Sequence, residues 1–345
     1  MPNAVDLFSG SGGVSQGLKA AGWQIVAACD NDPVAAATYR ANHPSTPFIE
    51  ADIQRDATVD QITRAVGTQK VDLLIICAPC QPFSSQNRRR GNDTREQMIV
   101  RALVFAARLK PAMIFFENVP GLATPAYRPI VSDVAAKLAD LGYAVTEPMV
   151  RDAADFGVPQ RRRRCIMLAA RSRSAIDAFS AMDTMTERKT VFAAIGDLPK
   201  LRSGEASDSD CLHRARTHLP IALERLRHIP RNGGNRRSLP PHLELECHKG
   251  KFKSFSDVYG RMVWESVAPT LTTGCTDLTR GRFAHPEQDR AITMREAARL
   301  QSFPDSYVFK GSVRQISQQI GNAVPPEMIT SFAAALAAAL ATQEE

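Results

Sequence analysis

The sequence contains no apolar run that approaches the ~20 residues needed to cross a bilayer. Its first residues lack the basic segment and apolar core of a secretory signal, and the alanine-rich stretch 331–342 is too short and too weakly apolar for an anchor. The cysteines number seven, which is odd, and they lack the spacing of a disulfide framework. These absences argue against a membrane, secreted or disulfide-bonded protein, and we expect a cytoplasmic monomer.

The composition is that of a soluble enzyme, with 44% hydrophobic and 23% charged residues. The net charge of +7 is moderate and does not by itself indicate a partner. Its distribution is more informative, because arginines gather in three separate segments, which are 88–90, 161–164 and 225–237. Separate basic clusters indicate a polyanion that contacts several parts of the molecule.

The first half of the chain alternates short apolar runs with helical periodicity, which predicts a doubly wound, Rossmann-like α/β sheet in a domain spanning 1–185. The run at 71–77 is apolar throughout, as is typical of a buried parallel strand. The predicted strands are 4–8, 24–29, 71–77, 113–117, 143–150 and 165–169, and the predicted helices are 14–21, 33–42, 94–110 and 130–141.

Regular periodicity fades after about residue 171, where glycine, proline, serine and arginine become frequent. We therefore expect a second, smaller and less regular domain at 186–290. A closing segment follows at 291–345, and within it Pro325-Pro326 opens a final helix with one apolar side. We expect this helix to return to the first domain.

A glycine-rich turn lies between the first predicted strand and the first predicted helix. Its residues are Phe8, Ser9, Gly10, Ser11, Gly12 and Gly13. Glycine lets a ligand approach the backbone closely, and a helix N-terminus offers free N–H groups, although such a turn also serves as a plain tight connection. Asp30 ends the second strand and favours a nucleotide-like cofactor, because an acidic residue there accepts hydrogen bonds from ribose hydroxyls. Asp52-Ile53 is a candidate contact for an adenine amino group and ring face, and a helix cap is the alternative for Asp52.

Cys80 lies just beyond the buried strand 71–77, between two prolines, and Glu117 ends the next apolar run. In a parallel sheet both side chains emerge at the carboxyl edge, where open α/β sheets bind their ligands. A soft nucleophile beside a carboxylic acid suits an attack on an aromatic base. A redox pair of Cys77 with Cys80 is disfavoured, because Cys77 lies inside the apolar strand. A zinc site is also disfavoured, because the spacing of its candidate ligands matches no regular finger; they are Cys211, His213, Cys247 and His248.

Two basic segments follow these strands. The loop 83–94 is polar, carries Arg88 and contains Gly91 as a hinge, so it predicts a mobile lid over the nucleophile, with a solvated loop as the alternative. The arginines 161–164 precede the strand 165–169. Alternation along a strand sends Arg162 and Arg164 to one face and the other two arginines to the opposite face.

Together these motifs resemble, in family order, those of the cytosine-C5 DNA methyltransferases. The resemblance covers residues 3–171 and about 259–340, and residues 186–258 take the position of the family's variable target-recognition region. Each motif is modest alone, but the set is very specific. The matching segments are 6–13 (cofactor loop), 79–81 (nucleophile, P-C-Q), 117–119 (E-N-V), 160–164 (Q-x-R-x-R), 295–304 (R-E-x-x-R-L-Q-x-F-P) and 319–325 (Q-x-G-N-A-V-P).

The resemblance implies a bacterial-type DNA (cytosine-5-)-methyltransferase that uses S-adenosyl-L-methionine, needs no metal and protects DNA from a separate restriction endonuclease. Cys80 would add to C6 of a cytosine flipped out of duplex DNA, Glu117 would contact N3 and the exocyclic amine, and Arg162 would lower the pKa of the Cys80 thiol. The expected cofactor contacts, besides the glycine turn, are Asp30, Asn31, Asp52, Ile53, Pro79, Asn322 and Val324. The expected DNA contacts are Gln81, Ser84, Arg88, Arg164, Arg236, Arg237, Thr272 and Thr273.

Three departures from the family pattern concern the cofactor site. Ser9 replaces a frequent alanine, Asp30 replaces the usual glutamate, and Asn31 replaces a bulky apolar residue that packs on adenine. Two alternatives stay open. One is the tRNA-modifying branch of the family, although its Cys-Phe-Thr signature is not found in the variable region. The other is a non-catalytic DNA-binding protein on this scaffold, which would be expected to have lost Cys80 or Glu117.

Overall fold

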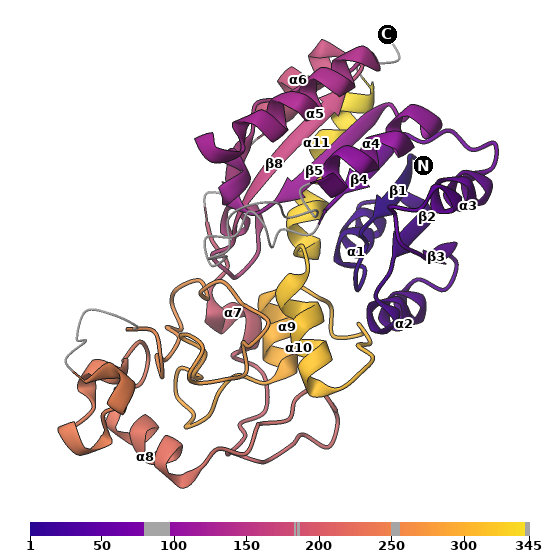
Figure 1. Ribbon diagram of the computed structural model, residues 1–345. Coiled ribbons are helices and arrows are strands. Elements are labelled where there is room, and N and C mark those ends of the chain that lie inside the picture. Colours follow the sequence, from indigo (N-terminus) through magenta and orange to yellow (C-terminus); the bar gives the residue numbers. More distant parts are fainter. Residues whose placement is uncertain (79–96, 183, 185–186, 250–255, 342–345) are drawn as a thin grey trace. The chain divides into compact units, whose positions relative to one another are not determined.

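The computed structural model describes residues 1–345 except 79–96, 183, 185–186, 250–255 and 342–345. The chain divides into two compact units (Figure 1). The first unit comprises residues 1–156, 163–185 and 324–345, and the second unit comprises 157–162 and 186–323. Residues 291–323, which we grouped with the closing segment, thus belong to the second unit, and the final helix belongs to the first.

The first unit is built on a sheet to which the described residues contribute eight strands. Five strands are parallel, and their spatial order is β3 (Phe48–Glu50), β2 (Gln24–Asp30), β1 (Asn3–Leu7), β4 (Leu73–Ile76) and β5 (Met113–Asn118). The remaining strands pair antiparallel: β8 (Arg163–Ala170) with β5, and β6 (Ala144–Val145) and β7 (Met149–Asp152) with β8. The predicted α/β fold is confirmed, with an antiparallel edge that the sequence pattern did not indicate.

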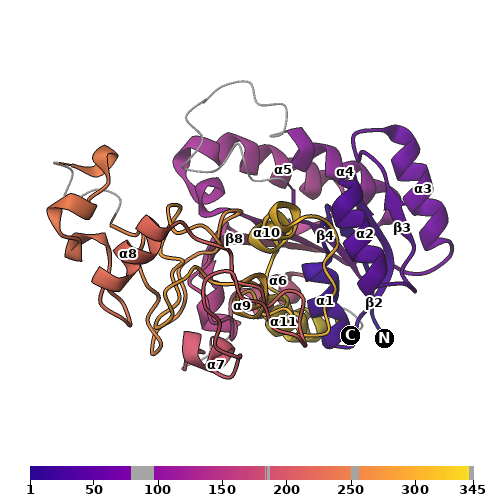
Figure 2. The same cartoon turned by 90° about the horizontal axis from the view of Figure 1, so that it is seen from below.

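Helices cover both faces of this sheet (Figure 2). One face carries α1 (Gly13–Ala20), α6 (Arg173–Ser180) and α11 (Pro326–Ala341), with α11 packed against the other two. The opposite face carries α3 (Asp56–Val66), α4 (Gln97–Leu109) and α5 (Arg128–Asp140). Helix α2 (Pro33–Asn42) packs on β2 and β3. Short 3-10 turns lie at Pro120–Ala123, Pro125–Tyr127 and Ala153–Phe156.

Local sequence explains where these elements lie. Strands β4 and β5 are buried at every position, because helices on both faces leave no solvent side for polar residues. Helix α2 has the predicted bounds. Pro33 sets its first turn, and the Oδ1 atom of Asp32 accepts the N–H groups of Val34 (2.8 Å) and Ala35 (3.1 Å).

The helical stretch 313–341 is long and apolar enough to cross a membrane by length and composition alone. The structure breaks this stretch into α10 (Val313–Asn322) and α11, with Ala323, Val324 and Pro325 between them. Met328, Ile329, Phe332 and Leu336 of α11 are buried. We therefore interpret α11 as a core helix of the first unit.

Glycine at position 17 allows α11 to lie directly on α1. A Cβ at this position would meet the carbonyl oxygen of Pro326 at 2.3 Å and the Cβ of Ile329 at 2.8 Å. The hydroxyl of Thr330 donates to the carbonyl oxygen of Gly17 at 3.1 Å and fastens the contact. Helices α1 and α11, more than 300 residues apart in sequence, are thus in direct contact at Gly17, where a larger residue would not fit.

The second unit is less regular, as predicted. Its described residues form no strand, only isolated bridges, and its helices are α7 (Val191–Ile195), α8 (Pro220–His228), α9 (Met294–Leu300) and α10. Short 3-10 turns lie at Arg236–Ser238, Pro241–Leu243 and Glu246–His248. An apolar core gathers around α9 and α10 and includes Met262, Leu271, Phe283, Leu300 and Ile320.

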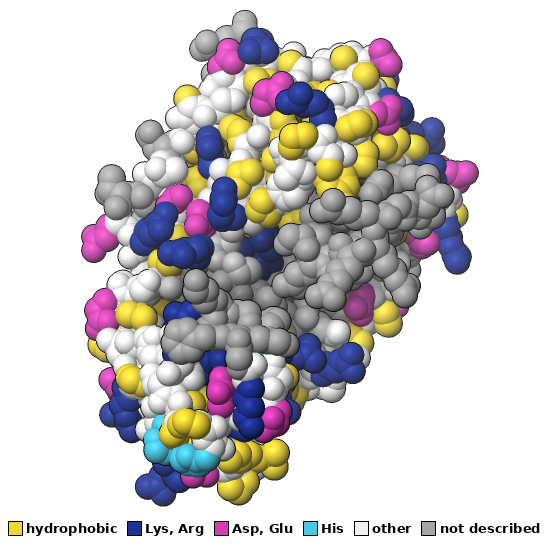
Figure 3. All heavy atoms as spheres, turned by 60° about the vertical axis from the view of Figure 1, so that its left-hand side comes forward, with side chains coloured by type: hydrophobic (Ala, Val, Ile, Leu, Met, Phe, Trp, Pro, Cys, Tyr) yellow, Lys and Arg dark blue, Asp and Glu magenta, His cyan; other side chains and the backbone are white. Residues whose placement is uncertain are grey.

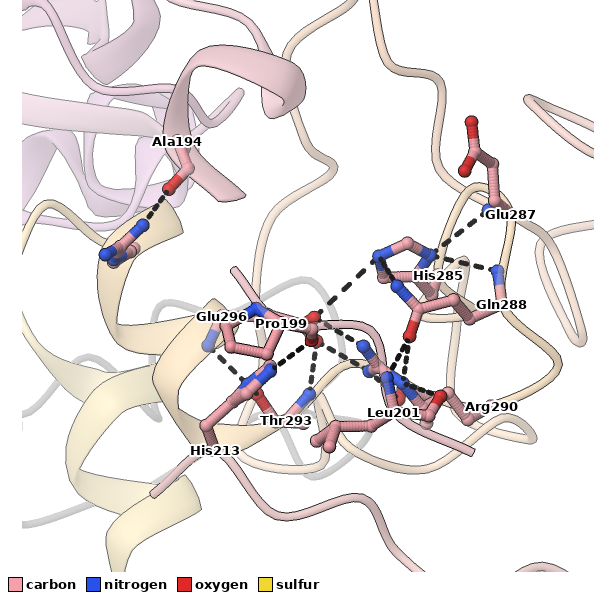
Figure 4. Close-up of polar contacts among 12 residues, drawn as sticks. Ala194, Pro199, Leu201, His213, His285, Glu287, Gln288, Arg290, Thr293 and Glu296 are labelled. Carbon is pink, nitrogen blue, oxygen red and sulfur yellow. Dashed lines mark hydrogen bonds and ion pairs between the residues drawn. The ribbon is translucent and has the colours of Figure 1, made fainter. Parts of the chain in front are cut away.

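A buried ion pair organises the start of α9 (Figure 4). Arg290 donates from Nη1 and Nη2 to the two carboxylate oxygens of Glu296, at 2.8 and 2.6 Å, and both side chains are almost fully buried. Glu296 also accepts the N–H of Thr293 (2.7 Å) in a capping box. Burial lowers the pKa of the nearby His285 to about 3, so its ring stays neutral. Glu296, the glutamate of the R-E-x-x-R motif, therefore has a structural role within the second unit, as the partner of Arg290.

The glycine contact predicts that Gly17→Ala destabilises the protein, because α1 and α11 must separate to admit the methyl group. We expect the free energy of unfolding to fall by about 1 to 3 kcal/mol in urea denaturation. Ala20→Ser, on an exposed position of the same helix, is the control and should be neutral. Unchanged stability in Gly17→Ala would contradict the close packing.

Candidate active site

Three adjacent strand ends form one edge of the first unit's sheet. The register pairs Leu7 of β1 with Ile76 of β4, and Ile76 with Phe116 of β5. The glycine turn follows Leu7, and Glu117 follows Phe116, so the two lie about two strand spacings, or roughly 10 Å, apart. The structure thus brings the predicted cofactor turn and the predicted catalytic carboxylate to one edge.

The glycine turn has an unusual backbone. Phe8 takes a left-handed φ of 59°, which is uncommon for a non-glycine residue, and Gly10 and Gly12 have φ values of 52° and 90°. Among the described residues, a Cβ on Gly10 would meet no atom within 4 Å, so the turn presents an open stretch of backbone. Gly12 precedes α1 and has no side chain to cap it, so in the described part of the chain no side-chain cap occupies the N–H groups of the first helical turn.

Asp30 ties this turn to the end of β2. Its Oδ2 atom accepts the N–H of Gly10 at 2.8 Å, and its Oδ1 atom accepts the N–H of Asp32 at 2.9 Å. Burial raises the pKa of Asp30, while these two hydrogen bonds favour its charged form. Each carboxylate oxygen has lone pairs beyond these bonds, so the arrangement is compatible with ribose binding. The neighbouring Asn31 is exposed.

Asp52 and Ile53 follow β3 and point to different environments. The Oδ1 atom of Asp52 accepts the N–H of Gln54 at 2.9 Å, while α3 begins only at Asp56, with Arg55 as its N-cap. The helix-cap alternative for Asp52 is therefore wrong. Ile53 is buried in the core of the first unit, whereas Asp52 is partly exposed.

Sequence reasoning did not single out Asp6, although a carboxylate inside an apolar strand just before a glycine turn was a usable signal. Asp6 is fully buried, and its Oδ2 atom accepts the hydroxyl of Ser15 at 2.7 Å. Its Oδ1 atom has no hydrogen-bond partner in the described part of the chain. Burial raises the pKa of Asp6 to about 7, and the charge of Asp30 adds to this increase. The group therefore titrates near neutral pH at the base of the turn.

Glu117 is paired with an arginine of the antiparallel strand. The Nε atom of Arg164 lies 2.8 Å from the Oε1 atom of Glu117, and the two side chains are only 12% and 10% exposed. Because β8 runs beside β5, the arginine reaches the carboxylate from the neighbouring strand. We predicted Arg164 as a DNA contact, and the structure gives it this additional role.

The burial of the four arginines alternates, but β8 begins at Arg163, so the predicted alternation along a strand applies only to Arg163 and Arg164. Arg161 and Arg163 are exposed, Arg162 is buried and Arg164 is mostly buried. Arg162 belongs to the second unit, where it donates to the carbonyl oxygens of Leu271 (3.2 Å) and Gly321 (3.0 Å). These bonds give Arg162 a structural role, and its effect on the thiol of Cys80 stays a prediction.

Asn118 forms a hydrogen bond with the backbone just after the end of β4. Its Nδ2 atom donates to the carbonyl oxygen of Ala78 at 3.2 Å, at the last described residue before the nucleophile motif. Burial of the Cys77 thiol, together with the negative charge of Glu117, raises the pKa of this thiol well above its usual value. The thiol therefore stays protonated. Five predicted site residues lie outside the described residues, namely Pro79, Cys80, Gln81, Ser84 and Arg88.

In the second unit, the loop with Thr272 and Thr273 is held closely by the Q-x-G-N segment. A Cβ on Gly321 would lie 2.6 to 2.7 Å from backbone atoms of these two threonines, and Ser317 donates to the carbonyl oxygen of Thr273 at 2.9 Å. Thr273 is exposed and Thr272 is partly buried. The predicted DNA-contact loop is thus rigidly supported.

The remaining predicted contacts differ in exposure. Asn322 is exposed and Val324 is buried. Arg236 is buried and lies 3.8 Å from Glu244, so it supports the fold rather than offering its side chain to DNA, whereas Arg237 is exposed. Basic and acidic side chains are interspersed on the face of the second unit seen in the lower part of Figure 3.

The chain belongs to the C-5 cytosine-specific DNA methylase family, whose model matches residues 3–338. Its curated relatives are type II restriction-modification methylases, and the chain is accordingly a DNA cytosine-5 methyltransferase. It is 37% identical to the type II methylase M.HgiDII of Herpetosiphon aurantiacus, over 93% of this chain and 91% of the relative. It is 33% identical to the type II methyltransferase M.XorII of Xanthomonas oryzae, over 100% of this chain and 86% of the relative.

Solved structures share the fold. A prophage-encoded protein of Escherichia coli assigned as a DNA modification methyltransferase superimposes with a TM-score of 0.77 at 23% identity, over 99% of this chain and all of the other. DNMT2 of Spodoptera frugiperda gives a TM-score of 0.61 at 20% identity, over 97% of this chain and 99% of the other. At these identities the likeness extends to the fold alone.

The buried carboxyl of Asp6 predicts a specific pH dependence of stability. Its pKa is about 7 in the folded protein against 3.8 in the unfolded chain, so the folded state holds the proton more tightly, and the stability from this proton is lost as the pH rises through 7. The free energy of unfolding of Asp6→Asn relative to the original protein should therefore rise by roughly 2 to 3 kcal/mol between pH 5 and pH 8. Urea denaturation at both pH values measures this difference. Asp140→Asn, at an exposed position at the end of α5, is the control. A difference in the free energy of unfolding between Asp6→Asn and the original protein that is the same at both pH values would refute the raised pKa of Asp6.

Proposed function

We propose that this methyltransferase moves the methyl group of S-adenosyl-L-methionine to C5 of a cytosine flipped out of a specific duplex DNA sequence, through a covalent adduct of Cys80 with C6. The observation that carries the proposal is the Glu117–Arg164 pair, buried on the sheet edge that also holds the glycine turn. A polarised carboxyl group and a nucleotide-binding turn on one edge are the parts that such a transfer needs.

The residues around the glycine turn fit the proposed methyl donor. When bound, S-adenosyl-L-methionine supplies a methyl group on a sulfonium that a carbon nucleophile displaces. The N–H groups at the start of α1, beside the open backbone at Gly10, suit the carboxylate of the donor's amino-acid end. The buried Oδ1 atom of Asp6 suits its ammonium group, and Asp30 suits its ribose hydroxyls. Asp52, which is partly exposed, would accept from the adenine amino group.

The chemistry begins with the thiolate of Cys80. Its addition to C6 makes C5 of cytosine nucleophilic, and Glu117 contacts N3 and the exocyclic amine, where charge develops. Arg164 holds the carboxyl group of Glu117 in place at 2.8 Å. After C5 has accepted the methyl group, a water molecule takes the C5 proton and the thiolate of Cys80 is eliminated from C6, which restores the aromatic ring. The base must leave the duplex to reach these groups, because neither C5 nor C6 is accessible inside the stack.

We assign methyl transfer to the first unit and recognition of the DNA sequence to the second unit. Thr273 and Arg237 are the best-suited predicted contacts in the second unit, because both are exposed. The likeness to type II methylases supports a bacterial cytoplasmic enzyme that protects DNA from a separate endonuclease. An assay with a labelled methyl donor, run once with duplex DNA and once with tRNA, separates this function from that of the tRNA-modifying branch. The proposal predicts that the DNA becomes labelled and the tRNA does not.

Cys80→Ser is expected to abolish methyl transfer while leaving DNA binding intact, because serine is a far weaker nucleophile toward C6. Bisulfite sequencing of DNA from cells that express each variant reports both activity and target sequence. Cys77→Ser is the matched control, since the proposal gives this thiol no part in the chemistry. Retained methylation by Cys80→Ser would remove Cys80 from the role assigned to it.

Arg164→Ala tests the pair that carries the proposal. Without the guanidinium, Glu117 loses its fixed orientation, and we expect kcat to fall about 100-fold, the size of effect typical for a lost electrostatic contact in an active site. Arg163→Ala removes the exposed neighbour on the same strand and should change kcat little. Equal effects of the two substitutions on single-turnover methylation would contradict the role of Arg164.

A further inference from the structure

A chain of buried hydroxyl groups leads from Asp6 to α2. The hydroxyl of Ser15, in α1, lies 2.7 Å from the Oδ2 atom of Asp6 and 2.7 Å from the hydroxyl of Tyr39, in α2. All three side chains are fully shielded from solvent. The predicted site does not include Ser15 or Tyr39, and the proposed chemistry does not use them.

The direction of these hydrogen bonds follows from counting protons. Ser15 has a single hydroxyl proton, and it donates that proton to the carboxylate of Asp6. The short contact between Ser15 and Tyr39 therefore requires Tyr39 to donate to the Oγ atom of Ser15. Hydrogen bonds aligned in one direction polarise each other, so the hydroxyl of Tyr39 strengthens the bond that Asp6 receives.

The titratable groups near Asp6 do not themselves stabilise its charged form. On β2, Asp30 carries a like charge and Cys29 is a neutral thiol, and beyond β4 the thiol of Cys77 stays protonated. None of these described neighbours supplies a positive charge. The hydroxyl and the backbone of Ser15 form the described hydrogen bonds that favour a charged Asp6, and the hydroxyl of Tyr39 supports the first of them through Ser15. His43, which packs on the ring of Tyr39 at 4.6 Å, has a pKa lowered to about 4 by burial and is neutral above pH 6.

We propose that Tyr39 is a positioning residue for the methyl donor: acting through Ser15, it keeps the carboxylate of Asp6 charged and fixed, with its Oδ1 atom turned to the donor's ammonium group. The inference rests on the proposed function, because it takes the glycine turn as the donor site. It also explains why α2, which follows the ribose-binding Asp30, is tied to the strand that carries Asp6. The two ends of the donor are then held by one connected set of residues.

The test compares donor binding by the full-length protein and by its Tyr39→Phe variant, using calorimetric titration of S-adenosyl-L-methionine between pH 6 and pH 9. Loss of the hydroxyl favours the neutral form of Asp6, so its ionisation needs a higher pH. We expect the variant's dissociation constant to exceed that of the original protein about threefold to fivefold at pH 6, with the ratio falling to one by pH 9. The value of kcat at saturating donor should change little. Ser15→Ala should show the same trend with a larger ratio.

Tyr143→Phe is the matched control, because it also removes a buried tyrosine hydroxyl, one that donates to the carbonyl oxygen of Pro111 at 2.6 Å away from the turn. It should lower stability without changing the pH dependence of donor binding. A Tyr39→Phe ratio that is constant with pH, or equal to one throughout, would overturn the inference. A protein that binds no donor at any pH would instead contradict the proposed function.

Discussion

The parallel pairing of β1, β4 and β5 is the constraint on which the site depends. These strands are covered by helices on both faces, so a charged residue within them would be buried without solvent. Polar groups are tolerated only where the strands end and other donors can reach them. Asp6, Asp30 and Glu117 all lie in the last two or three residues of their strands. Burial of the rest of the sheet thus gathers the polar chemistry at one edge.

The carboxylates at this edge differ in their partners, and the partners match the proposed ligands. Asp30 accepts two backbone N–H groups and Asp6 accepts a hydroxyl, and no cationic side chain among the described residues forms an ion pair with either. A positively charged methyl donor suits these two groups. Glu117 is neutralised by Arg164, which suits an uncharged cytosine ring. The partners of these carboxylates thus distinguish the side of the edge proposed for the donor from the side proposed for the base.

Much of this fold could be predicted from the sequence, because helix caps and apolar runs depend only on residues that are neighbours in the chain. The bounds of α2 follow from Asp32 and Pro33, and the apolar residues of β4 indicate a buried strand without further information. The pairing of Arg164 with Glu117 could not be predicted, since it requires knowing that β8 runs antiparallel beside β5, which periodicity does not encode. The burial of Arg236 and Ile53 could not be predicted for a related reason: residue type alone does not tell which arginine or isoleucine is buried.

The contact of α1 with α11 has a consequence for the order in which the protein matures. Helix α1 leaves the ribosome before residues 186–323 of the second unit are translated, and α11 leaves only after them. Until residues 326–341 emerge, the apolar surface of α1 that receives Ile329 has no cover. The first unit therefore completes its core only after the second unit and residues 326–341 have been synthesised, and a ribosome-bound fragment that ends before α11 lacks this contact.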